Sequence, residues 1–426
     1  PTEPPKKDVV YEYAPAADPN PEQQATKLAP TSATPTAKTQ EATQADPPTT
    51  PASPVGSAKN PTKNVIRVIN NWVGDAAKEL KIRLSNVNIK AENTSRYASG
   101  GRDFRTDEWW NCYYGVSAAQ VKGTGNTKIE LDGQNVLDSD VRSSTTTSVL
   151  WAGLNKKVGG NLTITDETSD TGETITAKDE TDTSGSLRAE GGEVGRAAAI
   201  GGNSGQATDN ITIEGYATVK ANTLGHNGAG IGGGNGAKGS NITIQGHANV
   251  TANGGWSGAG IGGGSLGSGS NIAVSGGEVT AQGGVGGAGI GGGQGGSGSN
   301  ITISDGKVTA TGAGAGAGIG GGYEGSGKGI TIEGGKVTAQ GDIGGAGIGG
   351  GISGTGSDVT ISGDAQVKVQ GGTTGRDWHK GAAIGNGGTR TTEGNEVSPN
   401  TSDLTVEGSI QIYEPGKNIN TDTPDK

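Results

Sequence analysis

Three short hydrophobic segments recur in the same order along residues 161–412 and define a repeat of about 29 residues. The third segment reads GAGIGGG in five copies, and their isoleucines are 30, 29, 29 and 29 residues apart. These isoleucines are Ile231, Ile261, Ile290, Ile319 and Ile348. The first segment reads NITI at Asn210, Asn241 and Asn300, with variants at Asn161, Asn271, Gly329, Asp358 and Asp403. The second is centred on Val219, Val250, Val279, Val308, Val337 and Val367, mostly as Val-Thr-Ala.

Within each segment the residues alternate with a period of two, which predicts β-strands and gives no support to helices. In the NITI copy at 210–213, Ile211 and Ile213 face one way and Thr212 faces the other. A fixed repeat of three strands is typical of a solenoid, in which each strand pairs with its equivalent one period away. We therefore predict an all-β fold, a single-stranded parallel β-helix solenoid with three strands in each coil.

The predicted interior is narrow, because each coil supplies only about six small aliphatic residues. In one coil these are Ile301, Ile303, Val308, Ala310, Ala317 and Ile319. Residues 64–160 carry larger apolar residues in a less regular order, including Ile82, Leu84, Val87, Ile89, Ile129, Leu131, Val136, Leu137 and Leu154. We interpret 64–160 as irregular N-terminal capping coils, because an uncapped first coil exposes a strand edge.

The two ends of the chain differ from the repeats. Residues 1–63 are rich in Pro, Thr and Ala, a composition that cannot bury enough apolar surface to offset the entropy of ordering. They are predicted to be a disordered linker, either an extended stalk or simply a solvated terminus. Residues 161–412 form the regular coils, and 413–426 are a C-terminal tail or linker.

Composition excludes several classes of protein. With 84 glycines and 4% aromatic residues, the chain cannot build a large globular core of aromatics and leucines. It contains no run of ~18 apolar residues, so we expect no membrane span. The net charge of −10, without a clustered Lys and Arg stripe, argues against nucleic acid as a partner. The single Cys rules out an internal disulfide framework and suits an exported protein.

The chain resembles Gly-rich β-helix repeat regions of Gram-positive bacterial surface proteins. The resemblance rests on the succession NVNIKA, IELDGQNVL, SLRAEGG, AAIGG, NITI, VTA and GAGIGGG. Those regions are similar to the pectate-lyase-like superfamily but lack its catalytic residues. The resemblance covers about residues 80–412 and implies a right-handed coil and a secreted, cell-wall-associated protein. It also implies an adhesive or carbohydrate-binding role, without specifying an activity.

An aromatic insert interrupts the predicted capping coils. Its aromatic residues are Tyr97, Phe104, Trp109, Trp110, Tyr113 and Tyr114. Flat aromatic faces stack on sugar rings, and the interleaved carboxylates and guanidinium groups can bond sugar hydroxyls. The insert is therefore either a plug that caps the solenoid or a glycan contact, and a mixture of both stays open.

Two repeat positions vary while their neighbours do not. Two residues before each GAGIGGG stand His226, Trp256, Val285, Gly314 and Ile343. Directly after it stand Asn235, Ser265, Gln294, Tyr323 and Ile352. Variable turn tips on a constant scaffold are typical of repeat proteins that bind ligands, which makes Trp256 and Tyr323 candidate glycan contacts. Relaxed constraint on exposed turns would produce the same pattern.

Other features favour structural interpretations. The glycines of GAGIGGG are expected to serve tight bends, although they could leave a bare strip for a partner. The acidic stretch 166–182 matches no calcium-loop spacing, which favours a hairpin-like insertion with a strand near 173–177. The recurrent Asn indicates a turn at the start of a strand, with side chains capping the backbone, rather than glycosylation. The three histidines occupy different phases, so no metal site is expected.

We expect a non-catalytic, exported cell-surface protein, a stalk or adhesin whose partners are glycans or host surface molecules. A carbohydrate-binding module is the alternative, and a polysaccharide lyase or an ice-binding protein ranks below both. Catalysis would need acids and bases clustered on one strand face, where the repeats show Thr and Gly. The Thr rows hold one outward Thr per strand, too few for an ice-binding face. We expect no cofactor and no membrane partner, and a chain that is monomeric or part of a larger surface protein.

Overall fold

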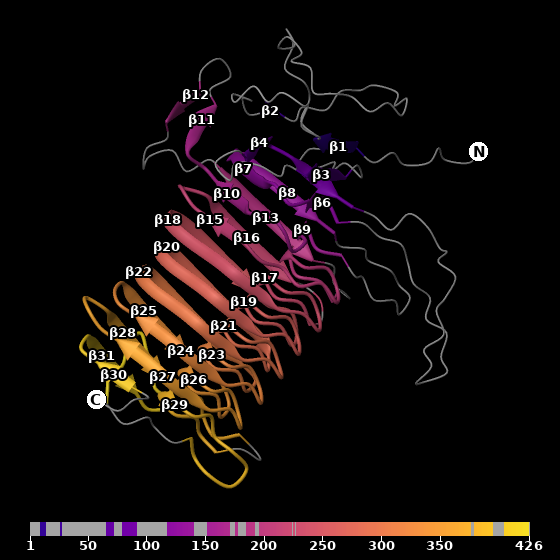
Figure 1. Ribbon diagram of the computed structural model, residues 1–426. Helices are drawn as coiled ribbons and strands as arrows, with labels where there is room; N and C mark the ends of the chain where they lie inside the picture. The colour runs from indigo at the N-terminus through magenta and orange to yellow at the C-terminus, as the bar shows by residue number, and fades with distance from the viewer. Residues whose placement is uncertain are drawn as a thin grey trace, which may run out of the picture.

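The computed structural model describes residues 9–13, 26–27, 65–71, 79–91, 117–139, 151–170, 175–177, 185–191, 196–223, 225, 227–375, 379–394 and 404–425. These residues confirm the predicted parallel β-helix solenoid. The coils stack into an elongated body, with the N-terminal coils at one end and the C-terminal coils at the other (Figure 1). Within these ranges, no helix is long and apolar enough to cross a membrane.

One ladder of eleven parallel strands is built from the GAGIGGG segments and their equivalents in the first coils. Its strands, in spatial order, are β1 (Val9–Tyr13), β3 (Ile66–Asn70), β6 (Ala119–Lys122), β9 (Leu154–Lys156), β14 (Ile200–Gly201), β17 (Ile231–Gly232), β19 (Ile261–Gly262), β21 (Ile290–Gly291), β23 (Ile319–Gly320), β26 (Ile348–Gly349) and β29 (Ile384–Gly385). Each isoleucine pairs with the isoleucine one period away, as Ile261 does with Ile290. The predicted register is therefore confirmed.

The other two segments of each coil form two further parallel ladders, joined into one sheet by three long strands. The joining strands are β18 (Gly239–Asn253), β20 (Gly269–Val285) and β22 (Gly298–Ala313). The NITI ladder also contains β2 (Thr26–Lys27), β4 (Glu79–Ser85), β7 (Asn126–Asp132), β10 (Leu162–Thr165), β15 (Ile211–Ile213), β24 (Gly327–Ile332), β27 (Gly356–Ile361) and β30 (Leu404–Val406). The Val-Thr-Ala ladder contains β5 (Asn88–Lys90), β8 (Gln134–Asp138), β13 (Ser186–Gly191), β16 (Thr218–Thr223), β25 (Lys336–Gln340), β28 (Gln366–Gln370) and β31 (Ser409–Tyr413).

Two short strands within the predicted linker 1–63 join these ladders. β1 pairs with β3 and β2 pairs with β4, both in parallel. The prediction of disorder is therefore corrected for these two segments. The physical reason is visible in β1, whose sequence VVYEY combines β-branched and aromatic residues that favour strands. The average composition of the tail conceals this local preference.

The core follows the alternation that the sequence predicts, with two exceptions. Five of the six residues predicted for one coil lie in the main hydrophobic cluster, whereas Ala317 is buried outside it. Ala317 stands in a tight turn, where its N–H donates to the carbonyl of Gly321 at 2.9 Å. In the capping coils Leu137 is fully buried but its neighbour Val136 is only half-buried, because adjacent strand residues face opposite ways.

The glycines of GAGIGGG are required mainly by close backbone packing, which corrects the emphasis on bends. In the copy at 258–264, only Gly262 has a φ in the left-handed region, at +132°. A Cβ on Gly258 would overlap the carbonyl oxygen of Gly228 in the preceding coil, and one on Gly264 would overlap that of Gly234. All seven residues of this copy are buried. The glycines therefore do not form a bare outer strip that a partner could reach.

Candidate functional site

The two variable positions of the repeat meet along one edge of the solenoid. The N–H of Gln294 donates to the carbonyl of Ser257 at 2.9 Å, and the N–H of Tyr323 donates to that of Gly286 at 2.7 Å. Each bond joins the residue after one GAGIGGG to the residue that follows Trp256 or Val285 in the preceding coil. Figure 1 shows the turns beside β17, β19, β21 and β23 gathered along this edge. We call this surface, centred on Trp256, Leu266, Val285, Tyr323 and Ile343, the turn edge.

Large apolar side chains are exposed on the turn edge. Trp256 is 59% exposed and Leu266 72%, and Val285 and Ile343 are also exposed. In the described part of the chain, the one further large apolar residue that is exposed is Val158. Because solitary exposed apolar residues are common but aligned ones are not, this grouping is typical of an interaction surface.

The aromatic candidate Tyr323 lies beside Gly286, the residue that follows Val285. A Cβ added at Gly286 would lie 3.4 Å from the Cβ of Tyr323 and 3.3 Å from that of Gln294. The Ser257 hydroxyl donates to Gln294 Oε1 at 2.9 Å. Burial, aided by the Glu324 carboxylate, raises the pKa of the Tyr323 hydroxyl.

The turn edge can offer aromatic and aliphatic faces next to amide and hydroxyl groups. Trp256 supplies an exposed ring, Tyr323 a half-buried one, and Gln294 an amide that bonds the hydroxyl of Ser257. This mixture suits ligands with one apolar face and polar edges. Sequence reasoning identified both variable positions but not their contact, because the contact depends on how the two turns flank a two-residue strand.

The aromatic insert lies outside the described residues. Its candidates Tyr97, Phe104, Trp109, Trp110, Tyr113 and Tyr114 therefore stay predictions, both as a cap and as a glycan contact. The acidic insertion is described in part, and β11 (Thr168–Asp170) pairs antiparallel with β12 (Ile175–Ala177). This pairing agrees with the predicted hairpin-like insertion.

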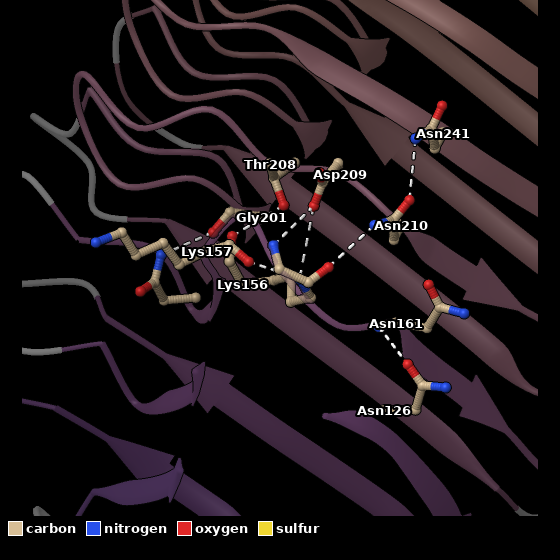
Figure 2. A network of polar contacts seen from close by, with 11 residues as sticks. Asn126, Lys156, Lys157, Asn161, Gly201, Thr208, Asp209, Asn210 and Asn241 are labelled. Carbon is tan, nitrogen blue, oxygen red and sulfur yellow. Dashed lines mark hydrogen bonds and ion pairs between the residues drawn. The ribbon is translucent and has the colours of Figure 1, made fainter. Parts of the chain in front are cut away.

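The recurrent asparagines form a ladder outside the coils, on the line of positions that matched glycosylation sequons (Figure 2). Asn241 donates from Nδ2 to Asn210 Oδ1 at 3.0 Å, and Asn271 donates to Asn241 in the same way. These residues have φ between 51° and 53°, a conformation that Asn tolerates better than most residues. The side chains bond to one another, and Asn210 Nδ2 also donates to the carbonyl of Gly159 at 3.0 Å, so the predicted capping of the backbone is present at that position.

A buried lysine lies near the start of this ladder (Figure 2). Lys156 is 2% exposed, and its Nζ donates to the carbonyl of Lys157 at 2.5 Å. Asp209 Oδ1 lies 3.8 Å from Nζ and also accepts from the Gly159 N–H at 3.2 Å. Burial lowers the pKa of Lys156, and the attraction of Asp209 offsets only part of that effect. The network thus links β9 and the residues after it to Asp209, just before β15.

Lys156 should make stability depend on pH in the alkaline range. Its pKa in the folded state lies below the ordinary value of 10.5, so the unfolded chain binds the proton more tightly. The destabilisation caused by burying the charged ammonium is complete below the lowered pKa and disappears as pH rises toward 10.5. The free energy of unfolding should therefore increase across this window. We expect Lys156→Met to lack that increase in urea unfolding at a series of pH values. Lys220→Met, at an exposed lysine, is the control, and an unchanged slope in Lys156→Met would contradict the assignment.

The remaining candidates have structural contacts. The ring of His247 stacks on Tyr216 of the preceding coil, with centroids 4.8 Å apart. The predicted Thr rows are in register, as Thr302 with Thr331 and Thr280 with Thr309 show. Among the described residues, no group of three or more His, Cys, Asp or Glu side chains is placed to hold a metal ion.

Comparison with known proteins supports the repeat architecture. The sequence model of a family described as Beta helix repeat matches residues 211–235, 242–265, 272–294, 301–323 and 330–352. Each match runs from the first isoleucine of a coil to the variable residue after GAGIGGG. Searches among curated proteins and among solved structures found no match. The likeness therefore concerns the repeat and its fold.

Proposed function

We propose that this protein is a non-catalytic, exported surface protein, an adhesin whose rigid solenoid presents the turn edge to a carbohydrate partner. The observation that carries the proposal is the alignment of the variable, exposed side chains on one edge. Their scaffold is stiff because each coil bonds its neighbours through continuous parallel ladders. The resemblance to Gly-rich repeats of Gram-positive surface proteins supports export and cell-wall association.

A carbohydrate partner is favoured over a purely mechanical stalk by the aromatic residues on the turn edge. A stalk needs no exposed Trp256, whose apolar surface favours association in water. An aromatic ring that stacks on a sugar, beside a Gln amide and a Tyr hydroxyl, provides both affinity and orientation. The aromatic insert would be a second contact on the same ligand or the cap of the solenoid.

The test is a glycan array with the full chain, followed by titration of the best ligand. We expect Trp256→Ala combined with Tyr323→Ala to weaken binding at least tenfold, about 1.4 kcal/mol, because central aromatic anchors dominate such interfaces. Tyr216→Ala removes a half-buried aromatic elsewhere on the solenoid and should leave binding unchanged. A similar loss in all variants, or no glycan binding at all, would contradict the proposal.

Two further measurements separate the alternatives. If Trp109→Ala with Trp110→Ala leaves glycan binding intact, the aromatic insert is not the glycan contact. If the chain degrades polygalacturonate or pectin, the non-catalytic assignment is wrong.

A further inference from the structure

A groove of about 340 Å³ lies on the outer face of the Val-Thr-Ala ladder, near its C-terminal end. Two neighbouring rows of outward side chains line it. Lys307 of β22 is the register partner of Lys336 in β25, and Thr338 in β25 is the partner of Lys368 in β28. Asn420, from the segment after β31, completes the lining.

The C-terminal segment is fastened over this end of the ladder. Gln370 Nε2 donates to the carbonyls of Glu414 at 2.7 Å and Lys417 at 3.0 Å. Lys368 Nζ lies 3.5 Å from the carbonyl oxygen of Ile419 and 5.9 Å from the centroid of the Tyr413 ring. The groove is therefore a formed feature of the fold, with a wall that the repeats alone do not supply.

The groove is cationic although the protein is acidic. Three of its lining residues are lysines and none is an Asp or Glu, whereas the whole chain has a net charge of −10. Lys307 has a countercharge, because its Nζ lies 2.6 Å from Glu278 Oε1. Lys336 is exposed and makes no ion pair with any residue that the structure describes.

The positions of the lysines create repulsion that an anion would relieve. Like charges directly opposite each other on paired strands are destabilising, and Lys336 stands opposite Lys307. Lys368 lies on the next strand, diagonally from Lys336, at a spacing that long side chains can bridge. Lys336 thus has a lysine on each of its two neighbouring strands, and Glu278, the acid paired with Lys307, lies outside the groove lining.

The rest of the lining is uncharged, and apart from Val337 and Val367 it is polar. It includes Thr309, Thr338, Gln366, Ser409, Gln411 and Asn420. These side chains donate and accept hydrogen bonds, as sugar hydroxyls require. The lining spans the successive strands β22, β25, β28 and β31, so a ligand would extend along the solenoid axis. The volume falls within the ~300–1,000 Å³ typical of small-molecule sites.

We propose that this lysine groove binds an anionic oligosaccharide, with its carboxylate or sulfate groups at Lys336 and Lys368 and its hydroxyls on the Thr, Gln and Asn side chains. Single-stranded nucleic acid fits less well, because its bases need aromatic platforms and the lining contains no aromatic residue. The groove and the turn edge are different surfaces, so this site does not depend on the carbohydrate role proposed above.

The experiment is calorimetric titration of the full chain with four probes: a uronic-acid oligosaccharide, a sulfated oligosaccharide, a neutral oligosaccharide and a single-stranded oligonucleotide. We expect one of the two anionic oligosaccharides to bind, with an affinity that falls as salt is raised, and the neutral one not to bind. The two anionic arms identify whether carboxylate or sulfate is recognised. No binding of either, or equally tight binding of the oligonucleotide, would overturn the proposal.

Substitutions test whether the oligosaccharide binds in the lysine groove. Lys336→Gln with Lys368→Gln should weaken binding at least tenfold, and Lys336→Arg should retain it because the charge remains. Lys220→Gln with Lys238→Gln removes two exposed lysines outside the groove and is matched in charge. Unfolding midpoints confirm that each variant is folded. If Lys220→Gln with Lys238→Gln weakens binding as much as the groove variant does, binding is a diffuse charge effect and the site is wrong. Trp256→Ala with Tyr323→Ala should leave this binding unchanged.

Discussion

Gly232→Ala should destabilise the solenoid by more than ~4 kcal/mol, whereas Gly236→Ala, four residues away, should cost only ~1–2 kcal/mol. Both glycines have positive φ, at +140° and +74°, so both substitutions place a side chain in an unfavourable backbone conformation. They differ in their surroundings. A Cβ on Gly232 would overlap the carbonyl oxygen of Gly262 in the next coil, whereas a Cβ on Gly236 meets nothing within 4 Å.

The size of the expected loss of stability follows from which atoms the new methyl group would displace. The atom that Gly232 would strike belongs to the backbone of β19, which is held between β17 and β21. A flexible side chain could rotate away, but a strand in a continuous ladder cannot shift without breaking its own hydrogen bonds. Because each coil contacts only its neighbours, the loss should fall on the interface between these two coils.

Thermal and urea unfolding of the full chain, followed by circular dichroism, would measure both effects. Midpoints are the quantity to compare, because long repeat arrays do not always unfold in one step. Similar midpoints for Gly232→Ala and Gly236→Ala would show that positive φ alone explains these glycines, and the packing interpretation would then be wrong.

The fold could be predicted because the repeat period is apparent in the amino-acid sequence itself. Ile261, Ile290 and Ile319 pair as their spacing requires, and the two-residue alternation places their side chains inside. The reason why glycine is required at these positions could not be inferred from the spacing. Whether a glycine serves a bend or a close approach depends on the distance to the next coil, which the spacing does not contain.

The candidate surfaces were harder to predict for a related reason. Lys307 and Lys336 are one period apart, so their alignment is visible in the sequence, but no run of basic residues along the chain marks it. Lys368 joins them from a neighbouring row, where the earlier coil has Thr338. The wall that includes Asn420 depends on how residues 414–425 fold back onto the last coils. Such contacts outside the repeat have no periodic signal.

The capping coils rely on a buried ion pair in a part of the solenoid with few glycines. Arg83 in β4 and Asp132 at the end of β7 lie 2.7 Å apart, and both side chains are buried. Burying a charge costs several kcal/mol unless a partner compensates it. We therefore expect Asp132→Asn to destabilise the protein by ~3–5 kcal/mol, because the guanidinium of Arg83 then keeps its charge in the interior without the carboxylate.

An exposed pair in the regular coils provides the matched comparison. Lys307 and Glu278 are 2.6 Å apart, but their side chains are 64% and 49% exposed. Glu278→Gln should therefore change stability by only ~0–1 kcal/mol, since water solvates both charges. Urea unfolding midpoints of Asp132→Asn, Glu278→Gln and the double variant Arg83→Met with Asp132→Asn would test this. The double variant should be more stable than Asp132→Asn alone, because it no longer buries the guanidinium group. If Asp132→Asn costs no more than Glu278→Gln, burial does not set the energy of this pair.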